Sequence, residues 1–200
     1  MMRVVLIDSG GANIGSVRYA FERLGVDARL SADPETIASA DRVILPGVGA
    51  ATAGMTRLRD LGLIELVRDL QQPLLGICLG MQMLFESSEE GDVECLGLMP
   101  GRVRRMPGWP GLRVPHMGWN TLQMQREDPL LAGIGDGSHA YFVHGYAAPV
   151  SDDTLATSEH GEPFAAVVRR GRCWGAQFHP ERSATVGARL LENFLSESLA

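Results

Sequence analysis

The chain has 200 residues, of which 45% are hydrophobic, and it carries a formal net charge of −6. This size and hydrophobic fraction predict one folded domain over residues 1–200 and exclude a disordered chain, while the negative charge argues against nucleic acid as the main partner. All eighteen basic residues are arginine, and the absence of lysine excludes Schiff-base chemistry, a lysine general base and a Walker-type phosphate-binding lysine.

The first half of the chain alternates short apolar runs with helical patterns. Residues 3–8 predict a strand that ends at Asp8. This run is too short for a signal-peptide core, and no later run approaches the length of a membrane span, so we expect a cytoplasmic protein. Further strands are predicted for 26–30, 41–46 and 72–78. Helices are predicted for 13–25, 33–40 and 52–70, the second capped by Asp33 and the third broken near Gly62.

This alternation predicts an α/β fold with a mostly parallel sheet and helices on both of its faces. Ligand sites in such sheets lie beyond the carboxyl ends of the strands, where residues 8–11, residues 46–49 and Cys78 fall. Residues 92–160 contain more glycine and proline and predict short antiparallel strands that add to the sheet. An amphipathic helix over 183–199 is predicted to close the chain.

Cys78 stands in the sequence Gly-Ile-Cys-Leu-Gly, between a predicted strand and a helix predicted over about 80–86. The pattern has the form of a nucleophile elbow with cysteine in place of serine, in which a Cβ at Gly76 or Gly80 would crowd the backbone. The helix N-terminus would favour a thiolate, and the N–H of Leu79 is placed to hold an oxyanion. The alternative is a buried structural cysteine, and the elbow alone does not decide between the two.

The other two cysteines, Cys95 and Cys173, lack this flanking pattern and are expected to be structural. Without a Cys-x-x-Cys pair, the three cysteines indicate neither a disulfide framework nor a zinc knuckle. No pair of histidines and cysteines has ligand spacing on one element. We therefore expect no metal and no cofactor.

A thiol nucleophile needs a base, and His179 is the best candidate because it ends an apolar strand and is followed by Pro180 and Glu181. On an extended strand, His179 and Glu181 project to the same side, so the carboxylate can orient the imidazole. Alone, this motif favours an ordinary turn at a strand end. Together with the elbow, it indicates a triad of Cys78, His179 and Glu181.

The Pro-Gly-Val-Gly loop at residues 46–49 has three possible roles. It can be a phosphate-binding turn, an ordinary loop or the second half of an oxyanion hole. No lysine follows it, which weakens the phosphate interpretation. We favour the oxyanion role, with the backbone of Val48 as the donor.

Three motifs resemble, in the same order, those of the class I (triad) glutamine amidotransferases: PGVG (46–49), GICLGMQ (76–82) and QFHPERS (177–183). The resemblance runs from residue 3 to the last helix. It implies that Cys78 attacks the side-chain amide carbon of glutamine, that His179 transfers the protons and that Glu181 orients His179. It also implies that the N–H of Leu79 and, after a peptide flip, an N–H of the Val48 region hold the oxyanion, and that water releases glutamate from the thioester. The residues implied to hold glutamine are Gly49, Gln82, Glu90, His144, Gly145 and Tyr146.

Residues 114–120 (VPHMGWN) and 141–146 (YFVHGY) resemble one subfamily in particular, the glutaminase subunits of imidazole glycerol phosphate synthases in histidine biosynthesis. This resemblance implies a heterodimer with a TIM-barrel cyclase subunit that uses the ammonia. The residues implied to face this partner or to gate the ammonia are Asn13, His116, Met117, Gly118, Trp119, Asn120, Tyr141 and Arg182. The sequence departs from the subfamily pattern at Ser9, Gly145 and Arg182, which concerns docking and not the triad.

Two other kinds of function remain open. The chain could be a glutaminase for a different synthase, such as that of pyridoxal phosphate or aminobenzoate, or a γ-glutamyl hydrolase that acts alone. Residues 114–120 argue for the first subfamily. The chain could also be a degenerate module that binds a partner or glutamine without catalysis, and the intact set of Cys78, His179 and Glu181 argues against that.

Overall fold

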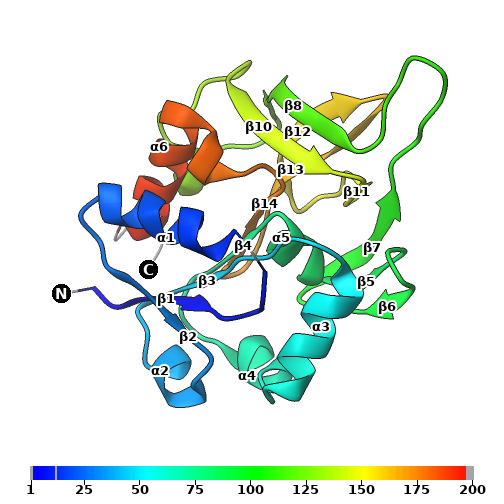
Figure 1. Cartoon of the computed structure of the whole chain (residues 1–200). Coiled ribbons are helices and arrows are strands. Elements are labelled where there is room, and N and C mark those ends of the chain that lie inside the picture. The colour runs from blue at the N-terminus through cyan, green and yellow to red at the C-terminus, as the bar shows by residue number, and fades with distance from the viewer. Residues whose placement is uncertain (1, 12, 197–200) are drawn as a thin grey trace.

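The computed structural model describes residues 2–11 and 13–196. Its centre is an eight-stranded sheet of order β2-β1-β3-β4-β14-β13-β12-β9 (Figure 1). The strands are β1 (Val4–Ile7), β2 (Ala28–Ser31), β3 (Arg42–Leu45), β4 (Leu74–Ile77), β9 (Gln123–Met124), β12 (Thr154–His160), β13 (Glu162–Arg170) and β14 (Cys173–Ala176). The strands from β2 to β14 in this order pair in parallel, and the remaining pairs are antiparallel. This arrangement confirms the predicted fold class.

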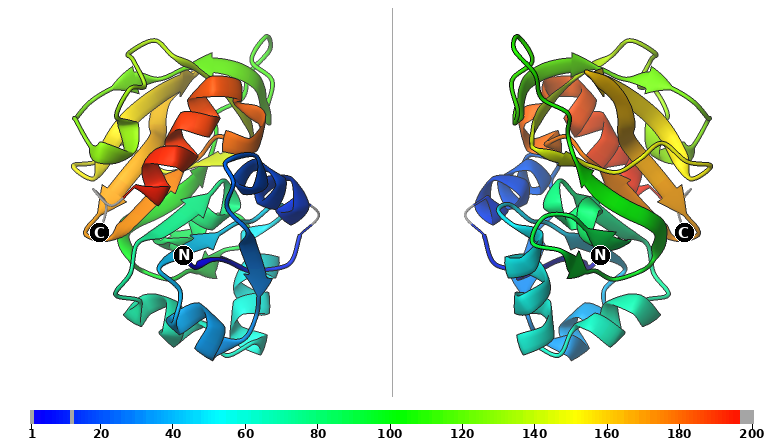
Figure 2. Two further views of the ribbon diagram at one scale, coloured as in Figure 1. Left: turned by 90° about the vertical axis from the view of Figure 1, so that its left-hand side faces the viewer. Right: turned by 90° about the vertical axis from the view of Figure 1, so that its right-hand side faces the viewer.

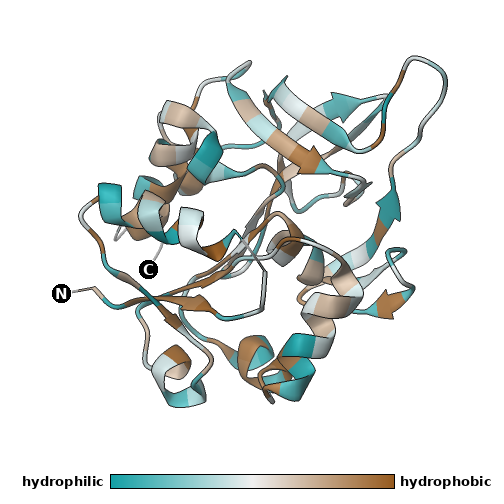
Figure 3. Ribbon diagram, in the orientation of Figure 1, coloured by the Kyte–Doolittle hydropathy of each residue, from teal (hydrophilic) through white to brown (hydrophobic). Residues whose placement is uncertain are grey.

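Helices cover both faces of the parallel part of the sheet, which is why strands such as β1 are apolar at every position. Val4 and Leu6 belong to one buried cluster, and Val5 and Ile7 belong to the other. The first cluster includes α1 (Ile14–Arg23) and α6 (Ala184–Leu195). The second includes α2 (Pro34–Ala38), α3 (Ala51–Asp60), α4 (Ile64–Asp69) and α5 (Leu79–Met83). Figures 1 and 2 show the two groups of helices on opposite sides of the sheet, and Figure 3 shows its strands as mainly hydrophobic.

The middle of the chain forms short strands, as predicted, but most of them build two smaller sheets instead of adding to the main one, and one of their pairs is parallel. A two-stranded ribbon pairs β8 (His116–Thr121) with β10 (His139–His144). A four-stranded sheet of order β11-β7-β5-β6 lies beside α3 and α5 (Figure 1). Its strands are β5 (Phe85–Ser88), β6 (Val93–Glu94), β7 (Met99–Arg105) and β11 (Tyr146–Ala147). Two short 3-10 helices, η1 (Pro129–Leu131) and η2 (Pro180–Arg182), complete the elements.

Several helix boundaries follow the sequence signals. The carboxylate of Asp33 accepts a hydrogen bond from the N–H of Thr36 at 2.8 Å, so the predicted cap is confirmed. The predicted helix over 52–70 is broken near Gly62, which has a φ of +68°. The final helix ends at Leu195, and residues 197–199 of its predicted span lie outside the described residues. In the described ranges, no helix combines the length and the apolar character that crossing a membrane requires.

The helix predicted over about 80–86 is wrong in length. The helix α5 ends at Met83, and the chain then enters the strand β5. Phe85 is fully buried in the second cluster, and β5 pairs with both β6 and β7. Pairing with two strands outweighs local helical propensity here, because most of the stability of a helix comes from tertiary packing.

Candidate active site

Cys78 joins β4 to α5 on a sharp turn. Its backbone has a φ of 53° and a ψ of −111°, a conformation that is costly for a residue with a Cβ and that marks functional sites. A Cβ at Gly76 would lie 2.7 Å from the carbonyl oxygen of Gly80, and a Cβ at Gly80 would overlap the carbonyl oxygen of Leu45. The two glycines therefore permit the close approach that the elbow pattern predicted. The turn holds the sulfur at the carboxyl edge of the sheet.

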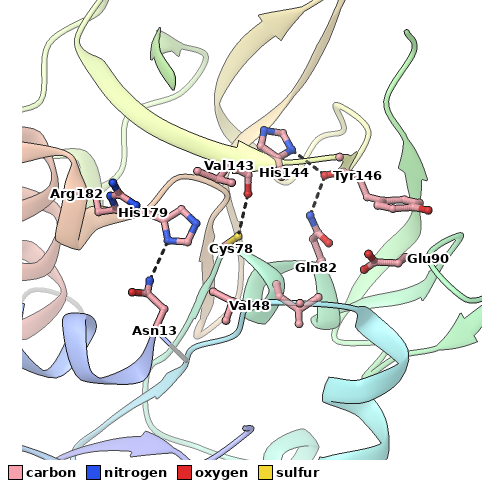
Figure 4. A pocket seen from close by; sticks show the side chains of 13 residues that line it. Asn13, Val48, Cys78, Gln82, Glu90, Val143, His144, Tyr146, His179 and Arg182 are labelled. Carbon is pink, nitrogen blue, oxygen red and sulfur yellow. Dashed lines mark hydrogen bonds between the residues drawn. The ribbon is translucent and has the colours of Figure 1, made fainter. Parts of the chain in front are cut away.

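His179 and Glu181 approach this sulfur from the other end of the chain. The His179 Nδ1 atom lies 2.8 Å from Oε1 of Glu181, and both side chains are buried. Because the carboxylate accepts the proton at Nδ1, Nε2 is left for Cys78 (Figure 4). Burial acts to lower the pKa of His179, but interactions with Cys78 and Glu181 outweigh it and raise this pKa to about 10. The pair therefore favours an imidazolium beside Cys78.

The prediction that His179 and Glu181 project from one extended strand is wrong. The strand β14 ends at Ala176, and Glu181 lies in the 3-10 helix η2. The hydroxyl of Ser183 donates to the carbonyl of His179 at 2.7 Å, which helps to fix this tight turn. The turn, and not strand alternation, brings the carboxylate to the imidazole.

Asn13 supports the same carboxylate from the loop before α1. Its Nδ2 atom donates to Oε1 of Glu181 at 2.6 Å and lies 3.4 Å from Nδ1 of His179. Burial acts to raise the pKa of Glu181, but contacts with His179 and Asn13 lower it below its usual value. Asn13, which was expected at the partner surface or the ammonia gate, therefore also holds the triad carboxylate, and its role toward a partner stays a prediction.

A cavity of about 270 Å³ opens beside the sulfur (Figure 4). This volume is below that of typical pockets for drug-sized ligands and suits a smaller molecule. Its lining includes all of the residues expected to hold glutamine: Gly49, Gln82, Glu90, His144, Gly145 and Tyr146. It also includes Cys78, His179 and Val48. The structure therefore brings the expected catalytic and binding residues together around one cavity.

One of the two expected oxyanion donors already has a partner within the protein. The N–H of Leu79 donates to the carbonyl of Gly47 at 3.3 Å, so this donor is already engaged. In the same loop, Gly49 has a φ of +96°, a backbone conformation that favours glycine, although no atom would contact a Cβ added there. The Leu79 donor becomes available to an oxyanion only if the Gly47 carbonyl turns away.

The residues expected to face a partner divide into two groups. Met117 and Trp119 are 64% and 53% exposed on the outer side of the ribbon. Tyr141 contacts the ring of Trp119 edge-on, and its own ring lies under the guanidinium of Arg182, which lines the cavity. These side chains form a row from the cavity rim to the ribbon surface.

His116, in contrast, turns away from that surface. Its side chain is only 5% exposed and stacks on the rings of Phe142 and His160. Gly118 and Asn120 are half-buried on the same strand. The alternation of side chains along β8 separates His116 from Met117 and Trp119, so the His116 side chain is not part of the exposed surface of the ribbon.

Gln177 is a residue of the site that the sequence patterns did not predict. This side chain is fully buried at the end of β14, accepts from Gln82 Nε2 at 2.9 Å and donates to the Cys78 sulfur at 3.8 Å. The sequence signal that could have pointed to Gln177 is that it is a polar residue inside the apolar run before His179.

Two buried histidines beside the cavity predict a pH-dependent stability. Burial, together with the charge of His160, lowers the pKa of His116 to about 4, and burial lowers the pKa of His144 to about 3. In the unfolded chain both imidazoles bind a proton below about pH 6.5, whereas the folded protein leaves them neutral until much lower pH. The unfolded state thus binds more protons in this window, and the free energy of unfolding should fall as the pH is lowered from about 6.5 toward 4.

Urea unfolding between pH 6.5 and 4.5 measures this slope. Replacing His116 by phenylalanine should reduce the slope by roughly 1 kcal/mol per pH unit, since one of the two suppressed protonations is removed. An equal slope in the variant would mean that His116 does not contribute to the pH dependence of the free energy of unfolding.

Comparisons with known proteins agree with this geometry. The pattern of the family "Glutamine amidotransferase class-I" matches residues 5–198. A protein of Xanthomonas axonopodis pv. citri, described as imidazole glycerol phosphate synthase subunit HisH, is 64% identical over 198 residues, which cover 99% of each chain. The protein of the same description from Xylella fastidiosa strain Temecula1 is 59% identical over the full length of both chains.

Solved structures share the fold. A glutamine amidotransferase crystal structure has a TM-score of 0.74 at 24% identity and covers 96% of this chain and 97% of its own. The glutaminase domain of a Trypanosoma brucei CTPS, with bound acivicin, has a TM-score of 0.66 at 15% identity and covers 97% of this chain and 94% of its own. The chain belongs to the class I glutamine amidotransferase family and, within it, to the HisH subunits of imidazole glycerol phosphate synthase.

Proposed function

We propose that this chain is the glutaminase subunit of an imidazole glycerol phosphate synthase in histidine biosynthesis. It hydrolyses glutamine to glutamate and ammonia and passes the ammonia to a cyclase subunit. The observation that carries the proposal is the meeting of Cys78 and His179 at one cavity, with Glu181 bound to His179, in a chain whose relatives are described as HisH subunits. Such an enzyme works in the cytoplasm.

The chemistry follows from the positions of the side chains. The Cys78 sulfur attacks the side-chain amide carbon of glutamine after its proton has passed to His179. The imidazolium then gives a proton to the nitrogen, the carbon–nitrogen bond breaks, and ammonia leaves a glutamyl thioester on the sulfur. Water, deprotonated by His179, attacks the thioester and releases glutamate and the thiol. Glu181 keeps Nδ1 of His179 protonated through both steps.

The loop at residues 46–49 provides a switch. The Leu79 N–H donates to the Gly47 carbonyl, so the oxyanion has no access to this donor until the loop changes. Glycines at positions 47 and 49 make rotation of a peptide plane in this loop inexpensive. The isolated chain should therefore turn over slowly, and a bound partner should favour the rotated loop.

The partner surface we propose is the row formed by Met117, Trp119, Tyr141 and Arg182. Exposed aromatic and methionine side chains are typical of interface centres. The row begins at the cavity rim, so a TIM-barrel cyclase seated there would receive ammonia directly. A sealed route matters because ammonia released into water is protonated and lost.

Mixing the chain with the cyclase subunit of a HisH-containing synthase tests the proposal. Glutamate release is followed for the chain alone, for the mixture, and for the mixture with the cyclase's nucleotide ligand. We expect slow release by the chain alone and an increase of about 100-fold or more in the liganded complex, the size of effect that one oxyanion donor supplies. Equal turnover with and without the partner would instead indicate a hydrolase that acts alone, and no turnover in any mixture would indicate a module without catalysis.

A further inference from the structure

A row of buried hydrogen bonds lies behind the His144 wall of the cavity, and the mechanism above does not use it. Nδ1 of His144 lies 2.8 Å from the carbonyl oxygen of Tyr146. Nε2 of His144 lies 3.2 Å from Nδ1 of His116, and Nε2 of His116 lies 3.3 Å from Nδ2 of Asn120. The row thus runs from the strand β8 to the backbone that lines the cavity.

The direction of every bond in this row is fixed by its two ends. A carbonyl oxygen only accepts, so Nδ1 of His144 carries the proton and its Nε2 accepts. Nδ1 of His116 must then donate, and its Nε2 accepts from Asn120. Burial keeps both imidazoles neutral, because it lowers the pKa of His116 to about 4 and that of His144 to about 3. Each histidine therefore has its proton on Nδ1.

The outer end of the row is held by backbone. Nδ2 of Asn120 donates to the carbonyl of Glu159 at 2.8 Å, and its Oδ1 accepts from the N–H of Thr121 at 2.8 Å. These two bonds determine which way the amide faces. The row therefore starts from a rigid donor.

The inner end continues to the nucleophile. The Tyr146 carbonyl also accepts a hydrogen bond from Nε2 of Gln82 (Figure 4), and the two atoms lie 2.8 Å apart. The same nitrogen donates to Oε1 of Gln177 at 2.9 Å, and Nε2 of Gln177 donates to the Cys78 sulfur at 3.8 Å. One buried network thus joins the ribbon to two residues of the cavity lining, Gln82 and Cys78.

We propose that His116 is a positioning residue that fixes His144, and through it the Tyr146 carbonyl and Gln82, in the geometry that binds glutamine. His116 does not line the cavity, and it acts only through His144. The inference rests on the proposed function, since the wall that it holds is that of the glutamine site. If His116 served only for packing, any flat ring between Phe142 and His160 would suffice. The positioning role requires in addition a hydrogen-bond donor directed at His144.

The positions of the protons can be measured without any substrate. Nitrogen-15 NMR of the imidazoles at pH 7 distinguishes a proton on Nδ1 from one on Nε2. We expect both His116 and His144 to carry it on Nδ1, the less common form in solution. A proton on Nε2 of either residue would overturn the inference, because the directed row could not then exist.

Two substitutions separate positioning from packing. His116→Phe keeps a flat ring but removes both hydrogen bonds, and His116→Asn returns a donor near the position of Nδ1. His139→Phe is the matched control, because His139 is an exposed histidine on the same ribbon. Urea unfolding of each variant first establishes that it is folded.

Labelling of Cys78 in the complex with the cyclase subunit gives the kinetic readout. The glutamine analogue 6-diazo-5-oxo-L-norleucine must bind the cavity before it reacts, whereas iodoacetamide requires only an accessible thiol. For His116→Phe we expect labelling by the analogue to fall about 10-fold, as a misplaced binding group predicts, with iodoacetamide changed by less than about 2-fold. His116→Asn should recover most of the loss, and His139→Phe should behave as the unmodified protein does.

Equal losses in the Phe and Asn variants, or no loss in the Phe variant, would overturn the positioning role. Failure of the analogue to label the unmodified protein would overturn the proposed function, and with it the substrate role of His116. The NMR measurement needs neither the analogue nor glutamine. Failure of the positioning role and failure of the proposed function can therefore be told apart.

Discussion

Replacing Cys78 by alanine is expected to remove glutamine-dependent activity and to leave the ammonia-dependent reaction of the complex unchanged. The sulfur is the atom that bonds to the substrate carbon in the proposed mechanism, and the methyl group of alanine cannot replace it. Loss of a triad nucleophile costs roughly 10⁴-fold or more in turnover. The cyclase subunit, supplied directly with ammonia, does not need the thiol.

Both activities are measured on the same complex, with glutamine in one assay and an ammonium salt at alkaline pH in the other. Cys173→Ala is the matched control, because Cys173 is half-buried in β14 and does not line the cavity. It should keep both activities. Loss of both activities in Cys78→Ala would contradict the assignment of roles, as would retained glutamine turnover.

Replacing Gly80 by alanine should strongly destabilise the fold. A Cβ at this position would overlap the carbonyl oxygen of Leu45, and backbone cannot move aside as a flexible side chain can. The strand β3, which ends at Leu45, is held between β1 and β4. We expect the free energy of unfolding to fall by about 3 kcal/mol or more, as for severe overpacking.

Gly15→Ala provides the comparison for this stability measurement. Gly15 lies in α1, and no atom would come within 4 Å of an added Cβ. Alanine favours a helix over glycine by about 1 kcal/mol, so this variant should be as stable as the unmodified protein or more stable. Urea unfolding of Gly80→Ala and Gly15→Ala tests the difference. Equal stability of the two variants would show that the backbone around the elbow can move to accommodate the added Cβ.

The parallel part of the fold was predictable because it follows local rules. Apolar runs alternate with helical patterns, and such alternation has few solutions. The length of α5 was not predictable, since residues 80–86 have a helical pattern. Only the pairing of Phe85–Ser88 with distant strands, which no local signal encodes, makes them a strand.

The triad residues were predictable from spacing and residue type, but their supporting contacts were not. Asn13 and Gln177 act on side chains far away in the sequence, so their partners depend on the completed fold. The inward direction of His116 depends on the register of β8, which a stretch containing histidine, methionine and tryptophan leaves open. All of the residues that the resemblance assigned to glutamine line the cavity, whereas the structure was needed to show which of them hold one another.

The position of β14 has a consequence for the stage of translation at which the active site can form. This strand comes from near the end of the chain, yet it pairs with β4 on one side and β13 on the other, in the interior of the sheet. The residues that follow it carry His179 and Glu181 to Cys78. On the ribosome, the nucleophile is thus synthesised long before its base. Under the proposed function, a nascent chain cannot cleave glutamine, so no ammonia is released before His179 and Glu181 have been synthesised.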